Sequence, residues 1–309
     1  MPPDAPASRS AWIGVACTLV GAIGFSGKTV FVKLAYQHGI DTLSLLALRM
    51  LFALPFFLVM IAWAGRGGAP LARRDWLSII GLGFIGYYLG SYLDLAGLQY
   101  ISAGLGRLIL YLYPTVVLVL AAVFLQQPVR ARHLVSLALS YGGIVLVFRH
   151  EAHLGEELAT MAWGALLVFG SAVTYATYLI AGSRLVQKTG SLRFTAYAST
   201  AATVFVLAHF LALGHPARLA ASAELYGIVL GMAVFSTVLP LWLMAEGLKR
   251  LGANQVALIA CVGPLATIVM AHFALGEPIT AAQLAGAALV LAGVMIISAK
   301  PQPAKPPPA

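Results

Sequence analysis

Four ionisable residues stand inside long apolar stretches of this sequence, and their chemistry suits the binding of a charged ligand. They are Lys28, Arg49, Asp94 and Arg107. Charge at the centre of a bilayer costs about 2.5 to 3.5 kcal/mol on insertion scales, so such side chains face protein or water and mark functional sites. We expect Lys28 or Arg107 to bind the carboxylate of a small-molecule substrate.

The same residues also have structural interpretations. The long stem of Lys28 allows its ammonium to reach the membrane interface, and Arg49, near the end of its stretch, is expected to tie two helices together. Asp94 and Arg107 flank a tight turn, which favours an ion pair between them over a proton-relay role for Asp94. Glu246 lies one turn before basic residues and is interpreted as an interfacial group.

Aromatic residues recur at helical spacing on several apolar stretches. Tyr88 and Tyr92 are four residues apart, Tyr175 and Tyr178 share one broad helical face, and Tyr111 precedes a proline. A phenol deep in a membrane needs a hydrogen-bond partner, which a cavity or a neighbouring helix must supply. The residues expected to line a substrate cavity are Tyr88, Tyr92, Tyr111, Tyr175, Tyr178 and Trp242.

The second half of the chain repeats the first at an offset of 150 residues. Residues 103–148 align without gaps on residues 253–298, and Pro114 coincides with Pro264. Each of these prolines removes a backbone N–H in the middle of an apolar stretch. Matching breaks in two halves point to a transport site or a gate, and a simple packing kink is the alternative.

The composition places the chain in a membrane. Charged residues make up 9% and hydrophobic residues 61% of the sequence, whereas a soluble domain carries about 25% charged residues. Apolar stretches of spanning length recur and predict ten transmembrane helices. The expected spans are 11–35, 42–64, 76–98, 102–125, 132–148, 161–182, 192–213, 224–248, 253–275 and 281–298.

Lys and Arg are distributed unequally over the connections between these spans. Lys33, Arg149 and Arg218 fall on one side, and the connections on the other side, together with both termini, carry most of the remainder. Basic residues mark the cytoplasmic side of a membrane protein. Both termini are therefore expected in the cytoplasm of a bacterium, with the chain crossing the inner membrane repeatedly.

Each half contains five spans, an odd number, so the second half must enter the membrane in the opposite orientation. The expected fold is all-α, with ten transmembrane helices in two inverted five-helix repeats. The repeats are residues 11–148 and 161–298, joined by an external loop at 149–160. Residues 1–10 form a cytoplasmic segment, and the Pro-rich residues 299–309 form a disordered cytoplasmic tail.

Several kinds of chemistry have no support in the sequence. Basic residues are dispersed, so no nucleic-acid binding is expected. Cys17, Cys261, His209 and His272 stand singly in apolar stretches and are interpreted as packing residues, so no metal or other cofactor is expected. No motif of nucleophile and base is present, which argues against an enzyme. The small-residue strips suited to helix packing or to a homodimer contact are Gly86 with Gly90, and Ala281 with Ala285, Ala288 and Ala292.

Ten spans in two five-helix halves resemble the drug/metabolite transporter superfamily, in particular its EamA-type members. The local marks are Ala47-Leu48-Arg49-Met50-Leu51-Phe52-Ala53 in the second span and Leu275-Gly276-Glu277-Pro278 after the ninth. In the first half the matching stretch is Leu125-Gln126-Gln127-Pro128, which lacks both the Gly and the Glu. The aromatic content is most similar to that of YddG-type exporters of aromatic amino acids. This resemblance implies a central cavity lined by spans 1, 3, 4, 6, 8 and 9.

Together these features predict an exporter of small amphipathic metabolites, either aromatic or other bulky apolar amino acids, that works by alternating access at a midplane cavity. One alternative is a proton-coupled exporter of drugs or cations, which is weakened because Asp94 and Glu246 are the acids within spans and neither is central. Another is a membrane scaffold or lipid-binding protein without transport. The paired broken spans argue against a scaffold.

Overall fold

The protein is built from helices. A computed structural model describes residues 9–64, 71–124, 126, 128–152, 157–214, 219, 222–251 and 253–298, and no strand occurs within these ranges. The first half contains α1 (Arg9–Gln37), α2 (Thr42–Ala64), α3 (Arg73–Leu82), η1 (Gly83–Leu89), α4 (Gly90–Gly97), α5 (Ala103–Leu110), α6 (Tyr113–Phe124) and α7 (Ala131–Ala152). The second half contains α8 (Leu158–Thr189), α9 (Ser191–Leu213), α10 (Ala223–Ala233), η3 (Val234–Val238), α11 (Leu239–Leu251), α12 (Ala253–Ala260), α13 (Gly263–Leu275) and α14 (Ala281–Ser298).

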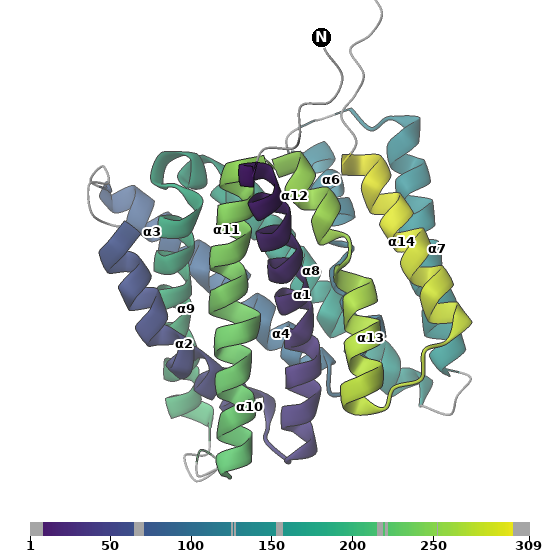
Figure 1. Ribbon diagram of the computed structural model, residues 1–309, viewed down its shortest axis with the longest axis horizontal. Helices are drawn as coiled ribbons and strands as arrows, with labels where there is room; N and C mark the ends of the chain where they lie inside the picture. Colours follow the sequence, from purple (N-terminus) through teal and green to yellow (C-terminus); the bar gives the residue numbers. More distant parts are fainter. Residues whose placement is uncertain are drawn as a thin grey trace, which may run out of the picture.

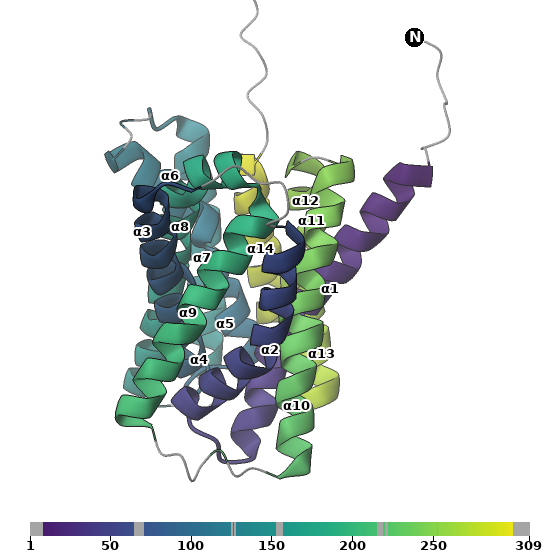
Figure 2. The same cartoon turned by 90° about the vertical axis from the view of Figure 1, so that its left-hand side faces the viewer.

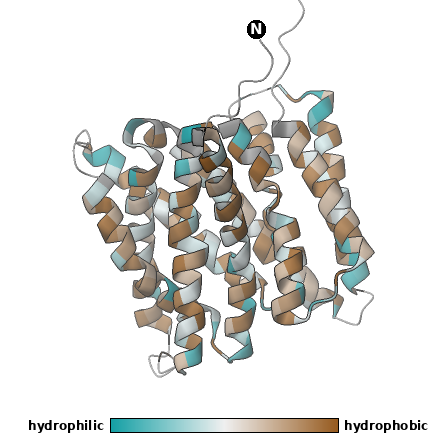
Figure 3. Ribbon diagram, in the orientation of Figure 1, coloured by the Kyte–Doolittle hydropathy of each residue, from teal (hydrophilic) through white to brown (hydrophobic). Residues whose placement is uncertain are grey.

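Eight helical stretches in the described part of the chain are long and apolar enough to cross a membrane, and α13 and α14 are shorter apolar helices. Figure 3 shows hydrophobic residues along the helices and hydrophilic residues gathered toward the two ends of the bundle. The expected external loop at 149–160 is shortened, because α7 continues to Ala152 and α8 begins at Leu158. The expected N-terminal segment up to residue 8, residues 153–156 and the expected tail at 299–309 lie outside the described residues.

Two π-helical segments occupy matching places in the two halves. η1 separates α3 from α4, and η3 separates α10 from α11 about 150 residues later. The Gly90 N–H donates to the Ile85 carbonyl and the Leu239 N–H donates to the Val234 carbonyl, five residues back in each case. Such wide turns shift the phase of a helix and are frequent at functional sites. The phase of the tyrosines in the third expected span is therefore set by η1.

The expected fourth and ninth spans are each broken once, at positions 150 residues apart. α5 gives way to α6 at residues 111–112, and α12 gives way to α13 at residues 261–262. The Leu112 N–H donates to the Ile109 carbonyl, and the Val262 N–H donates to the Ile259 carbonyl. Each break therefore contains one tight turn, in which the N–H bonds to the carbonyl three residues back. A proline follows each break by two residues. The sequence predicts these breaks because proline lacks the N–H that would continue the helix.

The helices pack in a pattern that links the two halves throughout. α1 packs against α11 and α13, α8 packs against α4 and α6, α2 packs against α9, and α7 packs against α14. Figure 1 shows α7 beside α14 at the right-hand side of the molecule, and Figure 2 shows α1 tilted relative to the other helices. The beginning of α1 and the end of α14 lie at the same end of the bundle (Figure 1).

Small residues permit the closest helix crossings. A Cβ on Gly86 would lie 2.6 Å from Tyr178, and one on Gly90 would lie 2.8 Å from the Thr174 hydroxyl, so this strip packs α8 against η1 and α4. The strip therefore serves packing within the chain. The alanines of α14 that the sequence offers for helix packing or a homodimer are exposed, and they are Ala281, Ala285, Ala288 and Ala292.

Candidate functional site

The four ionisable residues that the sequence places within spans of the first half gather into one cluster. The Lys28 ammonium of α1 lies 2.6 Å from the Asp94 carboxylate of α4, with 18% and 4% of the two side chains exposed. The expected ion pair between Asp94 and Arg107 is therefore wrong. Asp94 lies near the end of α4 and Arg107 near the start of α5, so the two are close along the chain. The rotation of α4, however, turns the Asp94 side chain toward α1. The partner is 66 residues away in sequence, beyond the reach of an inference from adjacent spans.

The two arginines of the cluster bind neutral partners. Arg49 donates from Nη2 to the Ser91 hydroxyl over 3.0 Å, which confirms that it ties two helices, α2 and α4. Arg107 donates from Nη2 to the Ser26 hydroxyl over 3.3 Å, and its guanidinium lies 5.0 Å from the centre of the Tyr111 ring. Arg49 is 4% and Arg107 is 7% exposed.

The cluster carries an excess of positive charge. Arginine stays protonated in proteins, and Asp94 is the carboxylate that neutralises Lys28. The Nε atoms of Arg49 and Arg107 are buried and lack a hydrogen-bond partner. Both guanidinium groups repel the Lys28 ammonium. A buried charge without a counter-charge is unfavourable, so this cluster is suited to accept an anionic group.

Tyr111 joins the broken helices of the two halves. Its hydroxyl donates to the Ala260 carbonyl over 2.8 Å. That carbonyl precedes Pro264 by four residues, and Pro264 has no N–H to bond it. Tyr111 thus satisfies the backbone group that the helix break leaves open, and a Cβ added to Gly263 would lie 2.0 Å from its hydroxyl.

Replacing Tyr111 by Phe is expected to lower the free energy of unfolding by about 1 kcal/mol, because the half-buried Ala260 carbonyl would lose its partner. Thermal or denaturant unfolding of the purified protein in detergent measures this loss. A Pro264→Ala background supplies an N–H at the position from which a helix bonds residue 260, so Tyr111→Phe should cost less there. Equal losses in both backgrounds would contradict this role of Tyr111.

Four tyrosines of η1, α6 and α8 form a continuous aromatic cluster, and two of them were expected to line the substrate cavity. Tyr175 and Tyr178 of α8 stack with ring centres 6.0 Å apart. Tyr113 meets Tyr175 edge-on at 5.1 Å, and Tyr87 of η1 meets Tyr178 edge-on at 5.1 Å. Phe194 of α9 stacks on the other side of Tyr178 at 5.5 Å. Tyr87 and Tyr113 were missed by the sequence reasoning, because the π turn and the helix break change which residues share a face.

Three other aromatic residues expected to line the cavity lie elsewhere. The Tyr88 hydroxyl bonds to Nδ1 of His209 on α9 over 2.8 Å, and Tyr92 also packs on that imidazole, with ring centres 5.4 Å apart. His209 is thus a helix-contact residue, as expected. Trp242 is 47% exposed and lines an apolar groove of about 510 Å³, together with Phe56, Val59, Met60, Trp63, Leu192 and Val238.

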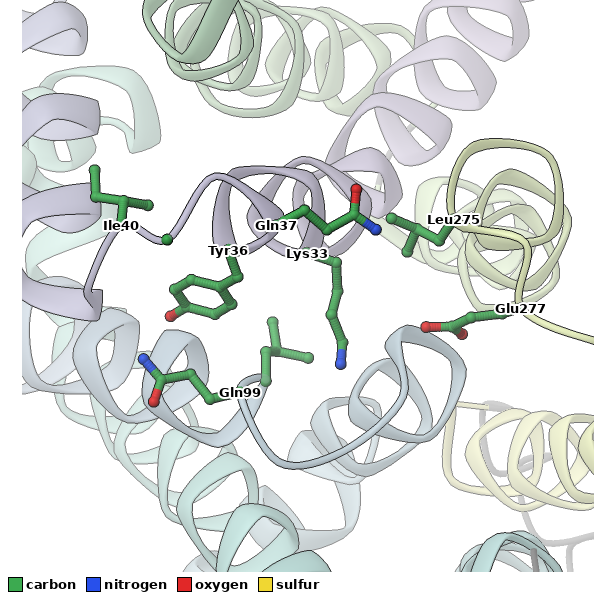
Figure 4. Close-up of a pocket in the computed structure, with 9 residues that line it drawn as sticks. Lys33, Tyr36, Gln37, Ile40, Gln99, Leu275 and Glu277 are labelled. Carbon is green, nitrogen blue, oxygen red and sulfur yellow. The ribbon is translucent and has the colours of Figure 1, made fainter. Parts of the chain in front are cut away.

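An open pocket of about 500 Å³ lies where α1 and α13 meet the turn between α4 and α5. Figure 4 shows Lys33 and Tyr36 projecting into it from α1, with Gln99 below and Glu277 on the opposite side. We call this pocket the vestibule. The Tyr36 hydroxyl donates to the Leu95 carbonyl over 2.7 Å, one residue beyond Asp94. The vestibule therefore adjoins the charged cluster.

Glu277 has a structural task at the edge of the vestibule. Its Oε1 accepts the Ala103 N–H over 2.9 Å, at the first residue of α5. A carboxylate at a helix N-terminus satisfies a free N–H and is stabilised by the helix dipole. Gly276 adopts a left-handed conformation, with φ of 72°, which ends α13 and turns Glu277 toward α5. This geometry explains the Leu275-Gly276-Glu277-Pro278 motif, and Gln127 of the other half lies outside the described residues.

Two other ionisable groups, Glu246 and His272, are paired within their own helix ends. Glu246 bonds to Arg250 one turn later at 2.6 Å, in agreement with its interpretation as an interfacial group. His272 Nδ1 lies 2.9 Å from the Glu277 carbonyl oxygen at the end of its own helix. No group of three or more metal-ligating residues occurs among the residues that the structure describes.

Comparison with known proteins identifies the relatives of this chain. Residues 12–149 and 162–299 each match the EamA-like transporter family. The uncharacterized transporter YcbK of Bacillus subtilis is 31% identical over 287 residues, which cover 90% of each chain. An uncharacterized transporter of Archaeoglobus fulgidus is 27% identical, covering 92% of this chain and 95% of its own. A solved crystal structure superposes with a TM-score of 0.64 at 16% identity, covering 91% of this chain and 96% of that one, and shows a shared fold.

Proposed function

Because this chain belongs to the EamA-like transporter family, we propose that it exports small amphipathic metabolites, specifically aromatic or other bulky apolar amino acids, across a bacterial inner membrane. The observation that carries the proposal is the buried cluster of three cations, Lys28, Arg49 and Arg107, in which the Asp94 carboxylate pairs with Lys28 and the two arginines bind serine hydroxyls. Its excess of positive charge attracts the carboxylate of the cargo. The cargo side chain would pack against the tyrosine cluster of η1, α6 and α8, whose aromatic surroundings favour an aromatic or apolar group.

The proposed binding residues are Lys28, Arg107, Tyr111, Tyr175 and Tyr178. Arg107 and Tyr111 are in contact through the cation and the ring face, so one aromatic ring lies directly at the charged cluster. Tyr88, Tyr92 and Trp242 have no part in this proposed site, because the first two contact His209 and the third faces the apolar groove.

Alternating access between two inverted repeats is the proposed mechanism. The repeat makes α1 equivalent to α8, α4 to α11 and α6 to α13. The packing of α1 on α11 then corresponds to that of α8 on α4, and the packing of α1 on α13 corresponds to that of α8 on α6. The contacts of α2 with α9 and of α7 with α14 map onto themselves. This pattern, with the paired breaks and paired π segments, supports a pseudo-twofold relation. Exchange of conformation between the halves would then open the site to each side in turn, with Pro114 and Pro264 at the moving breaks.

The charge of the cluster separates this proposal from its rivals. A cationic drug would be repelled by Lys28, Arg49 and Arg107, so a cation exporter is disfavoured. The Asp94 carboxylate is held by Lys28 rather than free for proton exchange. A scaffold without transport gives no reason for a buried cationic cluster adjoining an open vestibule.

Replacing Lys28 by Gln is expected to reduce the export of phenylalanine or tryptophan at low concentration by about tenfold or more, because a charged hydrogen bond to the cargo carboxylate is lost. Arg107→Gln should act in the same direction. Counterflow of the labelled amino acid in proteoliposomes measures both effects, and Arg149→Gln, an exposed arginine on α7, is the control. Normal flux in both cluster variants would overturn the proposed site, and a flux driven only by a pH gradient would favour the proton-coupled alternative.

A further inference from the structure

The walls of the vestibule carry opposite charges. Lys33 extends its ammonium into the pocket from α1, and Glu277 points its carboxylate inward from the segment after α13 (Figure 4). The amides of Gln37 and Gln99 add polar groups to the lining. The pocket thus presents a positive group and a negative group across one open space of about 500 Å³.

The vestibule also has an apolar side. Ile40, Leu98 and Leu275 line it beside the charged residues. Leu98 is fully buried, and α5 begins shortly after it, so this wall belongs to the rigid part of the bundle. A ligand with two opposite charges at one end and an apolar side chain at the other would match both parts of the lining.

The Glu277 carboxylate is held in position for such a ligand. Its Oε1 accepts the Ala103 N–H, and an ionised carboxylate has about four acceptor sites on its two oxygens. One backbone hydrogen bond therefore leaves acceptor sites for an ammonium group. The backbone carbonyl of Glu277 is 2.9 Å from His272 Nδ1, which fixes the segment from the other side.

We propose that the vestibule is a second binding site, selective for the zwitterionic head of an α-amino acid. The ligand carboxylate binds Lys33, its ammonium binds Glu277, and its side chain lies on the apolar side of the vestibule, against the partly exposed Leu275. The choice of an α-amino acid as the ligand rests on the proposed function. The consequence is a filter at this mouth of the protein, because the Glu277 carboxylate repels an anion that lacks the ammonium, and the Lys33 ammonium repels a cation that lacks the carboxylate.

Three ligands of one side chain test this site, with binding measured by calorimetric titration of the purified protein in detergent. They are phenylalanine, its methyl ester, which lacks the carboxylate charge, and N-acetylphenylalanine, which lacks the ammonium. The intact protein should bind phenylalanine about tenfold more tightly than either derivative, since each derivative loses one charged hydrogen bond.

Two variants assign the two charges. Lys33→Gln should abolish the preference for phenylalanine over the ester and keep the preference over the N-acetyl compound. Glu277→Gln should do the reverse, and the amide oxygen of Gln retains an acceptor for the Ala103 N–H, so α5 keeps its cap. Glu224→Gln, at the same end of the bundle but outside the vestibule, and Arg149→Gln should change neither preference.

The outcomes separate the vestibule from the proposed export. If Lys33→Gln and Glu277→Gln both keep the preferences of the intact protein, or weaken all three ligands equally, the zwitterion site is refuted whether or not amino acids are exported. If each variant loses its own preference while proteoliposomes show no flux, the vestibule site stands and the proposed export falls.

Discussion

Replacing Asp94 by Asn is expected to lower the free energy of unfolding by about 3 to 5 kcal/mol, the loss found when one partner of a buried ion pair is removed. The Asp94 side chain is 4% exposed and lies 2.6 Å from the Lys28 ammonium. Without its carboxylate, the cations Lys28, Arg49 and Arg107 would remain buried together with no anion among them. Thermal unfolding of the purified protein in detergent, or resistance to unfolding by a denaturing detergent, measures the change.

Two further variants show whether charge causes this loss. Asp75→Asn removes a carboxylate that lies 2.5 Å from Lys188 near the start of α3, outside the cluster. It should cost much less, because an ion pair with a half-exposed Lys contributes little and the Asn amide oxygen can still accept the Ala72 N–H. In the double variant Lys28→Gln with Asp94→Asn, one buried cation is removed as well, so part of the lost stability should return. A double variant less stable than Asp94→Asn alone would show that packing, rather than charge, explains the loss.

Replacing Gly143 by Ala is expected to lower the free energy of unfolding by about 1 to 3 kcal/mol, the typical cost of overpacking. A Cβ at this position would lie 2.7 Å from the backbone carbonyl oxygen of Gly286, so α7 and α14 would have to move apart. Backbone cannot rotate away as a side chain can. The same unfolding measurement in detergent tests this prediction.

The neighbouring glycine supplies a matched control. Gly142 precedes Gly143 on the same helix, and a Cβ there meets nothing within 4 Å. Gly142→Ala should leave the protein unchanged or stabilise it by up to about 1 kcal/mol, since alanine favours a helix more than glycine does. Opposite signs at adjacent positions are the expected result, and similar losses at both would mean that helix propensity or lipid contact, not the crossing, governs this surface.

The arrangement of the helices along the chain follows closely from the sequence. Apolar length alone locates α2 at Thr42–Ala64 and α14 at Ala281–Ser298, because a bilayer requires about 20 apolar residues for each crossing. Pro114 and Pro264 likewise predict the two helix breaks, since a missing N–H and a ring clash act within one turn. The π segments η1 and η3 were not predicted, because a wide turn carries no comparable residue signal.

The composition of the site is predicted only in part. The sequence identifies Lys28, Arg107, Tyr111, Tyr175 and Tyr178 as site candidates from the cost of burying charge and phenol in a membrane. It does not reveal Tyr87 or Tyr113, which complete the aromatic cluster. The sequence also does not predict the partner of Glu277, which caps a helix that begins 174 residues earlier.

The sequence by itself determined that this chain is a helical membrane protein, where its helices lie, where they break, and that Lys28, Arg49, Asp94 and Arg107 lie within its spans, because hydropathy and proline act over a few neighbouring residues. Only the tertiary structure decided that Asp94 pairs with Lys28 and not with Arg107, and that Lys33 and Glu277 line the same vestibule. Those pairings depend on the rotation and tilt of each helix against its neighbours. Rotation and tilt are set by side-chain packing between distant segments, which no local pattern records.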